Sequence, residues 1–134
     1  MVNQTITIQS PAKINLMLRV LGRRPDGYHE LQTVFKILNW GDHMHFTCND
    51  FGGEAEIQIS GFAGLAIEDN LIYQAAKLLK PYVISPCKVT IDVEKYIPQG
   101  GGLGGGSSNA ATTLKVLNNC WGCDLDQKQL MQLG

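Results

Sequence analysis

Six glycines occur within residues 100–106, in the sequence PQGGGLGGGSSNAA that covers positions 98–111. Glycines let backbone N–H groups come close to a ligand, and a helix that follows directly adds its free N–H groups and positive dipole end. This combination suits the binding of a phosphate group. Ser107 and Ser108 can cap the helix, or can offer hydroxyl groups to a phosphate or a metal ion.

Three other interpretations of this glycine segment fit less well. A flexible linker is disfavoured, because the segment lies between a predicted strand and a predicted helix. The Walker pattern requires a lysine directly after its last glycine, and none follows here. The dinucleotide pattern G-x-G-x-x-G matches at Gly100, Gly102 and Gly105. That pattern needs a tight turn straight after a strand of a parallel unit, whereas Pro98 and Gln99 intervene and the preceding strands look antiparallel.

The elements around the glycine segment predict an α+β fold, with strands first and helices later. Alternating apolar residues and tight turns favour antiparallel strands, which we expect over residues 5–9, 12–22, 29–39, 42–48, 54–60 and 87–95. Helical spacing predicts one helix over residues 69–82, a second directly after the glycine segment and a third from Asp126. Asp69 or Asn70 can cap the first helix, and Asp126 with Gln129 forms a candidate capping box.

The periodicity also predicts which side chains form the core. The strand residues that we expect to point inward are Met44, Phe46, Cys48, Val89, Ile91 and Val93. In the first helix the apolar residues at positions 71, 75, 78, 79 and 82 share one face. In the second helix the expected face is Ala110, Leu114, Leu117 and Trp121.

Composition narrows the class of protein. With 134 residues, 44% of them hydrophobic and 17% charged, the chain can fold as one domain with its own core. The net charge of −1 disfavours nucleic-acid binding through a general basic surface. No apolar stretch is long enough for a membrane span and the N-terminus does not resemble a secretory signal, so we expect a cytoplasmic protein without nucleic-acid or membrane partners.

Cysteine and histidine residues give weaker signals. Cys120 and Cys123 form a single CxxC pair, without the second pair that a structural zinc site would need, so we interpret the cysteines as ordinary buried thiols. His43 and His45 alternate along one predicted strand. No third ligand is placed to complete a metal site with them, and we expect a solvated strand face.

Three motifs carry a resemblance to a known family. The glycine segment closely resembles the phosphate loop of the GHMP kinases, in which Pro-x-Gly-x-Gly-Leu-Gly is followed by small residues. PAKINLMLRVLGRRPDGYHEL at 11–31 and EDNLIYQAAKLL at 68–79 are similar to segments of those family members that phosphorylate a methylerythritol carrying a cytidine diphosphate. The resemblance runs from about Ile8 to the end of the chain, with the motifs in the same order and spacing.

The resemblance implies a fold and an activity. The fold would be a ribosomal S5 domain 2-like, ATP-binding N-terminal domain over residues 1–134, apparently truncated, with the family's C-terminal ferredoxin-like domain absent. The activity would be the transfer of a phosphoryl group from ATP, with Mg²⁺, to the 2-hydroxyl of the substrate in the non-mevalonate isoprenoid pathway. The protein would be a monomer or a weak homodimer. Another small-molecule kinase of the superfamily and a non-catalytic nucleotide-binding module are the alternatives.

The resemblance also assigns site residues. Lys13 would be catalytic and contact the substrate, Asn15 would bind the polyol, and Tyr28 and His29 would hold the cytosine. Lys13 and Asn15 project from one strand face, about 7 Å apart. Ser107 is also the candidate for contacting Mg²⁺. The residues that would bind ATP are Asn70, Lys95, Pro98, Gly100, Gly101, Gly102, Leu103, Gly104, Gly105, Gly106, Ser107, Ser108 and Asn109.

One departure from the family concerns the catalytic base. The family's catalytic aspartate lies in a stretch that resembles GADVPF, and no segment of this chain matches it. The aspartates Asp26, Asp42, Asp92 and Asp124 stand in other sequence contexts. We therefore expect the chain by itself to be inactive.

Overall fold

The computed structural model describes residues 4–23, 29–49, 51–62, 64–98 and 104–133, and side chains for residues 5–13 and for the described residues from 37 onward. The strands are β1 (Gln4–Arg23), β2 (His29–Asn49), β3 (Glu56–Ser60) and β4 (Lys88–Glu94). The helices are α1 (Leu71–Leu79), α2 (Gly105–Cys120) and α3 (Gln127–Leu133). Short 3-10 turns stand at Ile67–Asp69 and Lys80–Tyr82.

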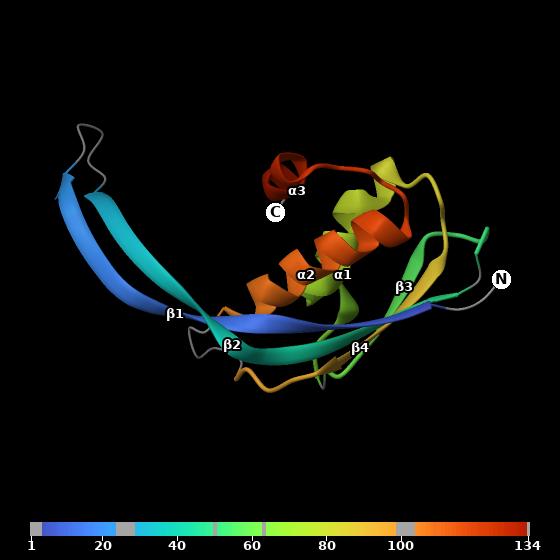
Figure 1. Cartoon of the computed structure of the whole chain (residues 1–134), viewed down its shortest axis with the longest axis horizontal. Coiled ribbons are helices and arrows are strands. Elements are labelled where there is room, and N and C mark those ends of the chain that lie inside the picture. The colour runs from blue at the N-terminus through green and yellow to red at the C-terminus, as the bar shows by residue number, and fades with distance from the viewer. Residues whose placement is uncertain (1–3, 24–28, 50, 63, 99–103, 134) are drawn as a thin grey trace.

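The four strands form one sheet in the order β1-β2-β4-β3. β1 pairs antiparallel with β2, and β2 pairs antiparallel with β4, whereas β3 runs parallel to β4 and reaches it through α1. All three helices lie on one side of the sheet (Figure 1). The predicted α+β fold, with a mostly antiparallel sheet and helices on one side, is confirmed.

Two predicted breaks between strands do not exist. The segments 5–9 and 12–22 are both part of β1, and the segments 29–39 and 42–48 are both part of β2. Pro11 pairs with Gly41 and Lys13 pairs with Ile37, so the β2 residues 38–40 lie opposite Ala12 alone. A proline is tolerated at such a bulge. Because the bulge interrupts the period-two pattern of apolar and polar residues, the sequence at this point resembles a turn.

The core lies between the sheet and the helices. The predicted inward-facing strand residues are all buried, with exposed fractions of 0% for Met44 and Phe46 and 6% or less for Cys48, Val89, Ile91 and Val93. From the second predicted helix face, Leu114, Leu117 and Trp121 are buried and Ala110 packs against the same core. Burying each large apolar side chain contributes about 1.5–3 kcal/mol, so this interface is the main source of stability.

The predicted apolar face of α1 is partly wrong. Leu71, Leu78 and Tyr82 are each about two-fifths exposed, and the core instead receives Ile72, Ala75, Ala76 and Leu79. These four residues also follow helical spacing, so the sequence offers two overlapping stripes that share positions 75 and 79. Because the helix ends at Leu79, position 82 falls in the 3-10 turn, where it no longer follows the helical face.

The helix caps agree with the sequence. The Asn70 side chain accepts a hydrogen bond from the Ile72 N–H at 2.9 Å, which caps α1. At the start of α3 the capping box is present in both directions: Asp126 accepts from the Gln129 N–H at 2.8 Å, and Gln129 accepts from the Asp126 N–H at 2.9 Å. Among the described residues, none of the helices combines the length and apolar character required to cross a membrane.

Candidate active site

Helix α2 begins within the glycine segment, at Gly105. Gly104 is its N-cap, with a left-handed backbone (φ 71°, ψ 23°), and its carbonyl oxygen accepts the N–H of Ser108 at 2.9 Å. The first N–H groups of a helix have no partner within the helix, so this end can donate hydrogen bonds to an anion. Gly100, Gly101, Gly102 and Leu103 lie outside the described residues, and their predicted roles stay predictions.

Lys13 lies across Gly104. A Cβ atom at position 104 would stand 2.5 Å from Cε and 2.9 Å from Cγ of Lys13, closer than non-bonded carbon atoms approach. The absence of a side chain at Gly104 therefore lets the lysine reach the start of α2. The predicted catalytic lysine and the predicted phosphate-binding segment, which are remote in sequence, are brought into contact.

A hollow of about 290 Å³ opens beside this contact, between β1, β2 and α2. Lys13, Ser107 and Ser108 line it, together with Lys115, which the sequence analysis did not select. Lys115 stands seven residues after Ser108, two helical turns along the same face, and this spacing is the signal that could have identified it. Two lysine side chains and the N-terminus of a helix around one hollow favour an anionic ligand.

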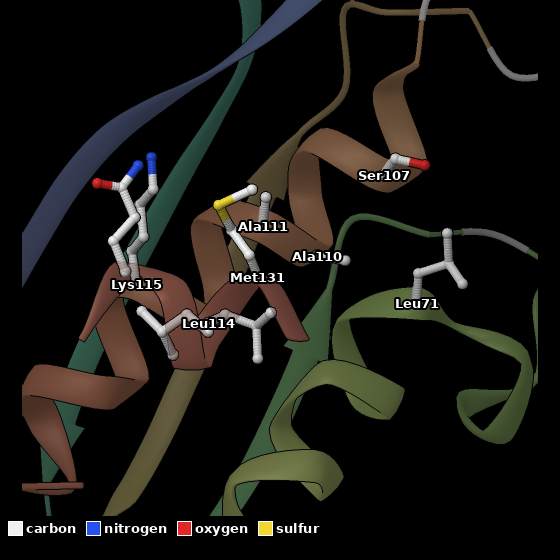
Figure 2. Close-up of a pocket in the computed structure, with 9 residues that line it drawn as sticks. Leu71, Ser107, Ala110, Ala111, Leu114, Lys115 and Met131 are labelled. Atoms are coloured by element: carbon white, nitrogen blue, oxygen red, sulfur yellow. The ribbon is translucent and has the colours of Figure 1, made fainter. Parts of the chain in front are cut away.

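A second hollow, of about 490 Å³, lies between α2, α3 and the first residue of α1 (Figure 2). Its lining is mainly apolar, with Leu71, Leu114 and Met131, and Ser107 and Lys115 line both hollows. A Cβ atom at Gly106 would be 3.0 Å from Leu71, so the start of α1 touches the end of the glycine segment.

The two candidate serines have different surroundings. Ser108 accepts a hydrogen bond at 2.9 Å from the hydroxyl of Ser10, which is fully buried in β1. Ser107 is exposed and lines both hollows. Ser107 is therefore the hydroxyl better placed to meet a ligand, while Ser108 fastens α2 to the sheet.

The start of α2 is also held by Asp42, which the sequence analysis did not select. Asp42 is fully buried, and its Oδ1 accepts the backbone N–H groups of Tyr96 at 2.7 Å and Ile97 at 2.9 Å. Its Oδ2 accepts Lys95 Nζ at 2.5 Å and Asn109 Nδ2 at 3.1 Å. Asn109 Nδ2 also donates to Ser10 at 2.8 Å. We call Asp42, Lys95, Asn109 and Ser10 the polar cluster.

The surroundings of Asp42 determine its charge. Burial by itself would raise the pKa of this carboxyl group. Hydrogen bonds from the N–H of Ile97, from Lys95, from the N–H of Tyr96 and from Asn109 outweigh burial and hold the pKa below its ordinary value. Asp42 is therefore an anion at neutral pH, paired with the ammonium of Lys95.

Gly41 explains how Asp42 reaches the polar cluster. A Cβ atom at Gly41 would collide with the backbone oxygen of Ser10, so only glycine lets β2 come this close to β1. The close approach places Ser10 beside Asp42, its register partner. Because Gly41 falls between the predicted strands 29–39 and 42–48, where a glycine indicates a turn, the sequence did not reveal this arrangement.

Asn70 and Lys95, which the resemblance assigns to ATP binding, both have structural partners. Asn70 is 6% exposed and caps α1, next to Leu71, which touches Gly106. Besides Asp42, the Lys95 ammonium donates to Asn109 Oδ1 at 3.2 Å. These contacts do not test a role in nucleotide binding, which stays a prediction, as does that of exposed Pro98.

The predicted cytosine site lies largely outside the described residues. Tyr28 is not described. Asn15 pairs with Phe35 within the β1–β2 hairpin, and His29 pairs with Arg23 at its far end; the side chains of Asn15 and His29 are not described. This end of the hairpin extends beyond the helices (Figure 1). The roles predicted for these three residues stay predictions.

The histidines lie on a solvated strand face, and the cysteines are buried or half-buried thiols. His43 is exposed, and His45 Nε2 donates to Glu94 Oε1 at 2.8 Å on the solvated face of the sheet. No group of three potential metal ligands occurs in the described part of the chain. The four cysteines are free thiols, and burial raises the pKa of Cys48 to about 12 and that of Cys87 to about 11.

Comparison with known proteins places these features in a family. The model of the GHMP kinases N terminal domain matches residues 70–134, which contain α1, β4, α2 and α3. The chain is 54% identical over 129 residues to the 4-diphosphocytidyl-2-C-methyl-D-erythritol kinase of Acinetobacter baumannii, covering 96% of this chain and 46% of the relative. The kinase of the same name from Methylococcus capsulatus is 51% identical over 134 residues, which are 100% of this chain and 45% of the relative.

Solved structures give the same result. A crystal structure of 4-(cytidine 5'-diphospho)-2C-methyl-D-erythritol kinase superposes with a TM-score of 0.77 at 37% identity, over 96% of this chain and 46% of that chain. The mevalonate kinase of Methanococcus jannaschii superposes with a TM-score of 0.65 at 16% identity, over 97% of this chain and 44% of that chain, a likeness of fold alone. The chain spans about half the length of these relatives. It belongs to the GHMP kinases and has the fold of their N-terminal domain.

Proposed function

We propose that this chain provides the ATP-binding part of a kinase that phosphorylates the 2-hydroxyl of 4-diphosphocytidyl-2-C-methyl-D-erythritol, in the non-mevalonate route to isoprenoid precursors. The observation that carries the proposal is the contact between Lys13 and Gly104 at the N-terminus of α2. It supports a site in which the end of a helix binds ATP phosphates while a lysine reaches the phosphoryl group that is transferred. The names of the relatives at about half identity support the substrate.

The chemistry follows from charge. In the transfer, the bond between the γ-phosphorus and the β–γ bridging oxygen breaks, and a new bond forms to the substrate hydroxyl oxygen, which loses its proton to a base. Negative charge spreads over the transferring group, where the Lys13 ammonium and the N–H groups of α2 can stabilise it. The family's aspartate base has no match here, so we expect the chain alone to show background turnover.

The residues around the hollow fit a nucleotide bound with Mg²⁺. The described residues that line it offer two lysines and two serines and include no carboxylate. Mg²⁺ keeps several waters and is commonly bound through substrate phosphates and few protein oxygens. Ser107 is the exposed hydroxyl that would contact the ion, whose role is to neutralise phosphate charge. In this proposal residues 1–134 form one domain.

Lys13 is the residue that tests the proposal. Titration of the chain with ATP and Mg²⁺ in a calorimeter should give saturable binding. For turnover, we would use a chimaera in which residues 1–134 replace the matching half of the Acinetobacter baumannii kinase. Removing one preorganised donor typically costs about 10²–10³ in rate, so Lys13→Ala should lower single-turnover phosphoryl transfer by about that factor, with substrate affinity changed only a few-fold.

Lys128→Ala, which removes an exposed ammonium of α3, is the matched control and should leave the rate unchanged. A chimaera that binds ATP but transfers no phosphoryl group to the cytidine substrate would contradict the proposal, and would favour another substrate or a non-catalytic module. Normal phosphoryl transfer by the Lys13→Ala variant would refute only the catalytic role of Lys13 and not the rest of the proposal.

A further inference from the structure

Asp42 joins the two stems of the glycine segment. The stem that enters the segment contains Tyr96 and Ile97, whose N–H groups both bond to Asp42 Oδ1. The stem that leaves it is the first turns of α2, where Asn109 donates to Oδ2 of the same carboxylate. One buried side chain from β2 therefore bonds to the chain on both sides of residues 98–104.

The two stems also touch each other at this level. A Cβ atom at Gly105 would be 3.0 Å from Cγ2 of Ile97 and 3.4 Å from Nζ of Lys95. Ile97 is 2% exposed, so the entering stem is packed against the first residue of α2. The hydrogen bonds of Asp42 thus act where the stems meet, at the N-terminus of α2.

We propose that Asp42 is a positioning residue that fixes the separation of the two stems, and through it the affinity for nucleotide phosphates. This inference rests on the proposed function, because it takes the nucleotide as the ligand. Glycines have many accessible backbone conformations, and a site built from them gains affinity when its ends are fixed before the ligand arrives. Asp42 itself lines neither hollow and is not expected to touch the ligand.

The cluster requires a carboxylate for a specific reason. Asp42 Oδ2 faces two donors, the ammonium of Lys95 and the amide nitrogen of Asn109. Asp42→Asn would keep an oxygen that accepts the N–H groups of Tyr96 and Ile97. Its amide nitrogen, however, would replace Oδ2 and would be a third donor facing Lys95 and Asn109. Breaking one side of a buried charge pair is strongly unfavourable, so the two stems should separate.

The structure also offers a rescue. Lys95 Nζ lies within hydrogen-bond distance of both side chains, 2.5 Å from Asp42 and 3.2 Å from Asn109. The double variant Asp42→Asn/Asn109→Asp moves the carboxylate to the other side of the same contact, so that one carboxylate, one amide and the ammonium remain together. The Ser10 hydroxyl can turn to donate to the relocated carboxylate. The swap therefore restores the cluster with the shape of every side chain nearly unchanged.

The experiment is a double-mutant cycle on the 134-residue chain, with ATP affinity measured by calorimetry and stability by urea unfolding. Asp42→Asn and Asn109→Asp should each weaken ATP binding about tenfold or more, and the double variant should bind within about threefold of the wild type. The restored affinity is a result that general loss of stability does not give.

Two controls separate positioning from stability. Asn118 is a buried amide at the other end of α2 that bonds to both the N–H and the C=O of Leu125 at 2.9 Å. Asn118→Ala should lower the stability of the chain but leave its ATP affinity within about twofold of the wild type. Asp92→Asn removes an exposed carboxylate that lies outside the cluster and should change neither quantity. If Asp42→Asn does not fold, the ATP affinities of Asn109→Asp and of the double variant still test the inference.

Hydrogen exchange gives a readout that does not depend on nucleotide. In Asp42→Asn, the N–H groups of Tyr96 and Ile97 should exchange faster, and those near Trp121 should not change. If the wild type binds no ATP, the proposed function fails, and exchange alone decides whether Asp42 fixes the stems. Unchanged exchange, ATP affinity within twofold in Asp42→Asn, or a swap that recovers stability without affinity would each overturn the inference.

Discussion

Helix α2 is fixed by apolar packing at its C-terminal end and by hydrogen bonds at its N-terminal end. At the C-terminal end, Leu117 and Trp121 are fully buried, and the Trp121 indole donates to the Cys87 carbonyl at 2.9 Å. At the N-terminal end, the polar cluster holds the helix through Asp42 and Asn109. Apolar packing is nondirectional and contributes stability, whereas hydrogen bonds fix distances. The N-terminal end, which faces the candidate site, is thus held at fixed distances from β1 and β2.

The largest expected effect tests the apolar end. Trp121→Ala should lower the free energy of unfolding by about 3–5 kcal/mol, because it empties a large volume in the core. Urea unfolding measures this loss. At a temperature where the variant stays folded, its ATP affinity should remain within about twofold of the wild type. A tenfold loss of affinity in the folded variant would show that the two ends of α2 are not independent.

A smaller effect tests the end that faces the site. Gly104→Ala should cost about 1–2 kcal/mol for the left-handed backbone and should also push Lys13 away. Gly64→Ala is the matched control, because Gly64 has a φ of 72° against 71° for Gly104, and nothing lies within 4 Å of its added Cβ atom.

Both glycine variants should lose similar stability, but in the chimaera only Gly104→Ala should slow single-turnover phosphoryl transfer. Equal transfer rates in the two variants would mean that the contact between Gly104 and Lys13 has no catalytic consequence.

The smallest effect is the pH dependence of the polar cluster. The pKa of Asp42 is lower in the folded chain than its ordinary value, so its contribution to stability is fully present above about pH 4, the unfolded value. This contribution to stability is lost as the pH falls through the pKa that Asp42 has in the folded chain. Unfolding measured from pH 7 to pH 3 should show an acid-side loss that is smaller in Asp42→Asn. An equal loss in both proteins would place the titrating group elsewhere.

The sequence predicted what is local. Period-two alternation identified Met44, Phe46 and their neighbours in the core, and the spacing of Asp126 and Gln129 identified a capping box. These features depend on residues a few positions apart, where backbone geometry alone decides which side chains meet. The α1 face was only partly predicted, because two stripes satisfy the same period.

The polar cluster could not be predicted in this way. Asp42 is 53 residues from Lys95 and 67 from Asn109, so no periodicity relates them. Its context, directly after a glycine in a strand, resembles a turn, and the bulge opposite Ala12 hides the continuity of β2. For Lys13 the resemblance predicts a catalytic role, which stays a prediction, whereas the folded chain shows that the lysine lies against Gly104.

The spacing of the polar cluster has a consequence for the order of folding. The hydrogen bonds that Asp42 and Ser10 accept from Lys95 and Asn109 join residues that are 53 to 99 positions apart. Closing such long loops is slow compared with forming a hairpin or a helix. During synthesis, Asp42 therefore lacks its full set of hydrogen-bond donors until α2, which contains Asn109, has emerged from the ribosome. The candidate site is therefore completed late, when the sheet and the helices of a newly made chain have assembled.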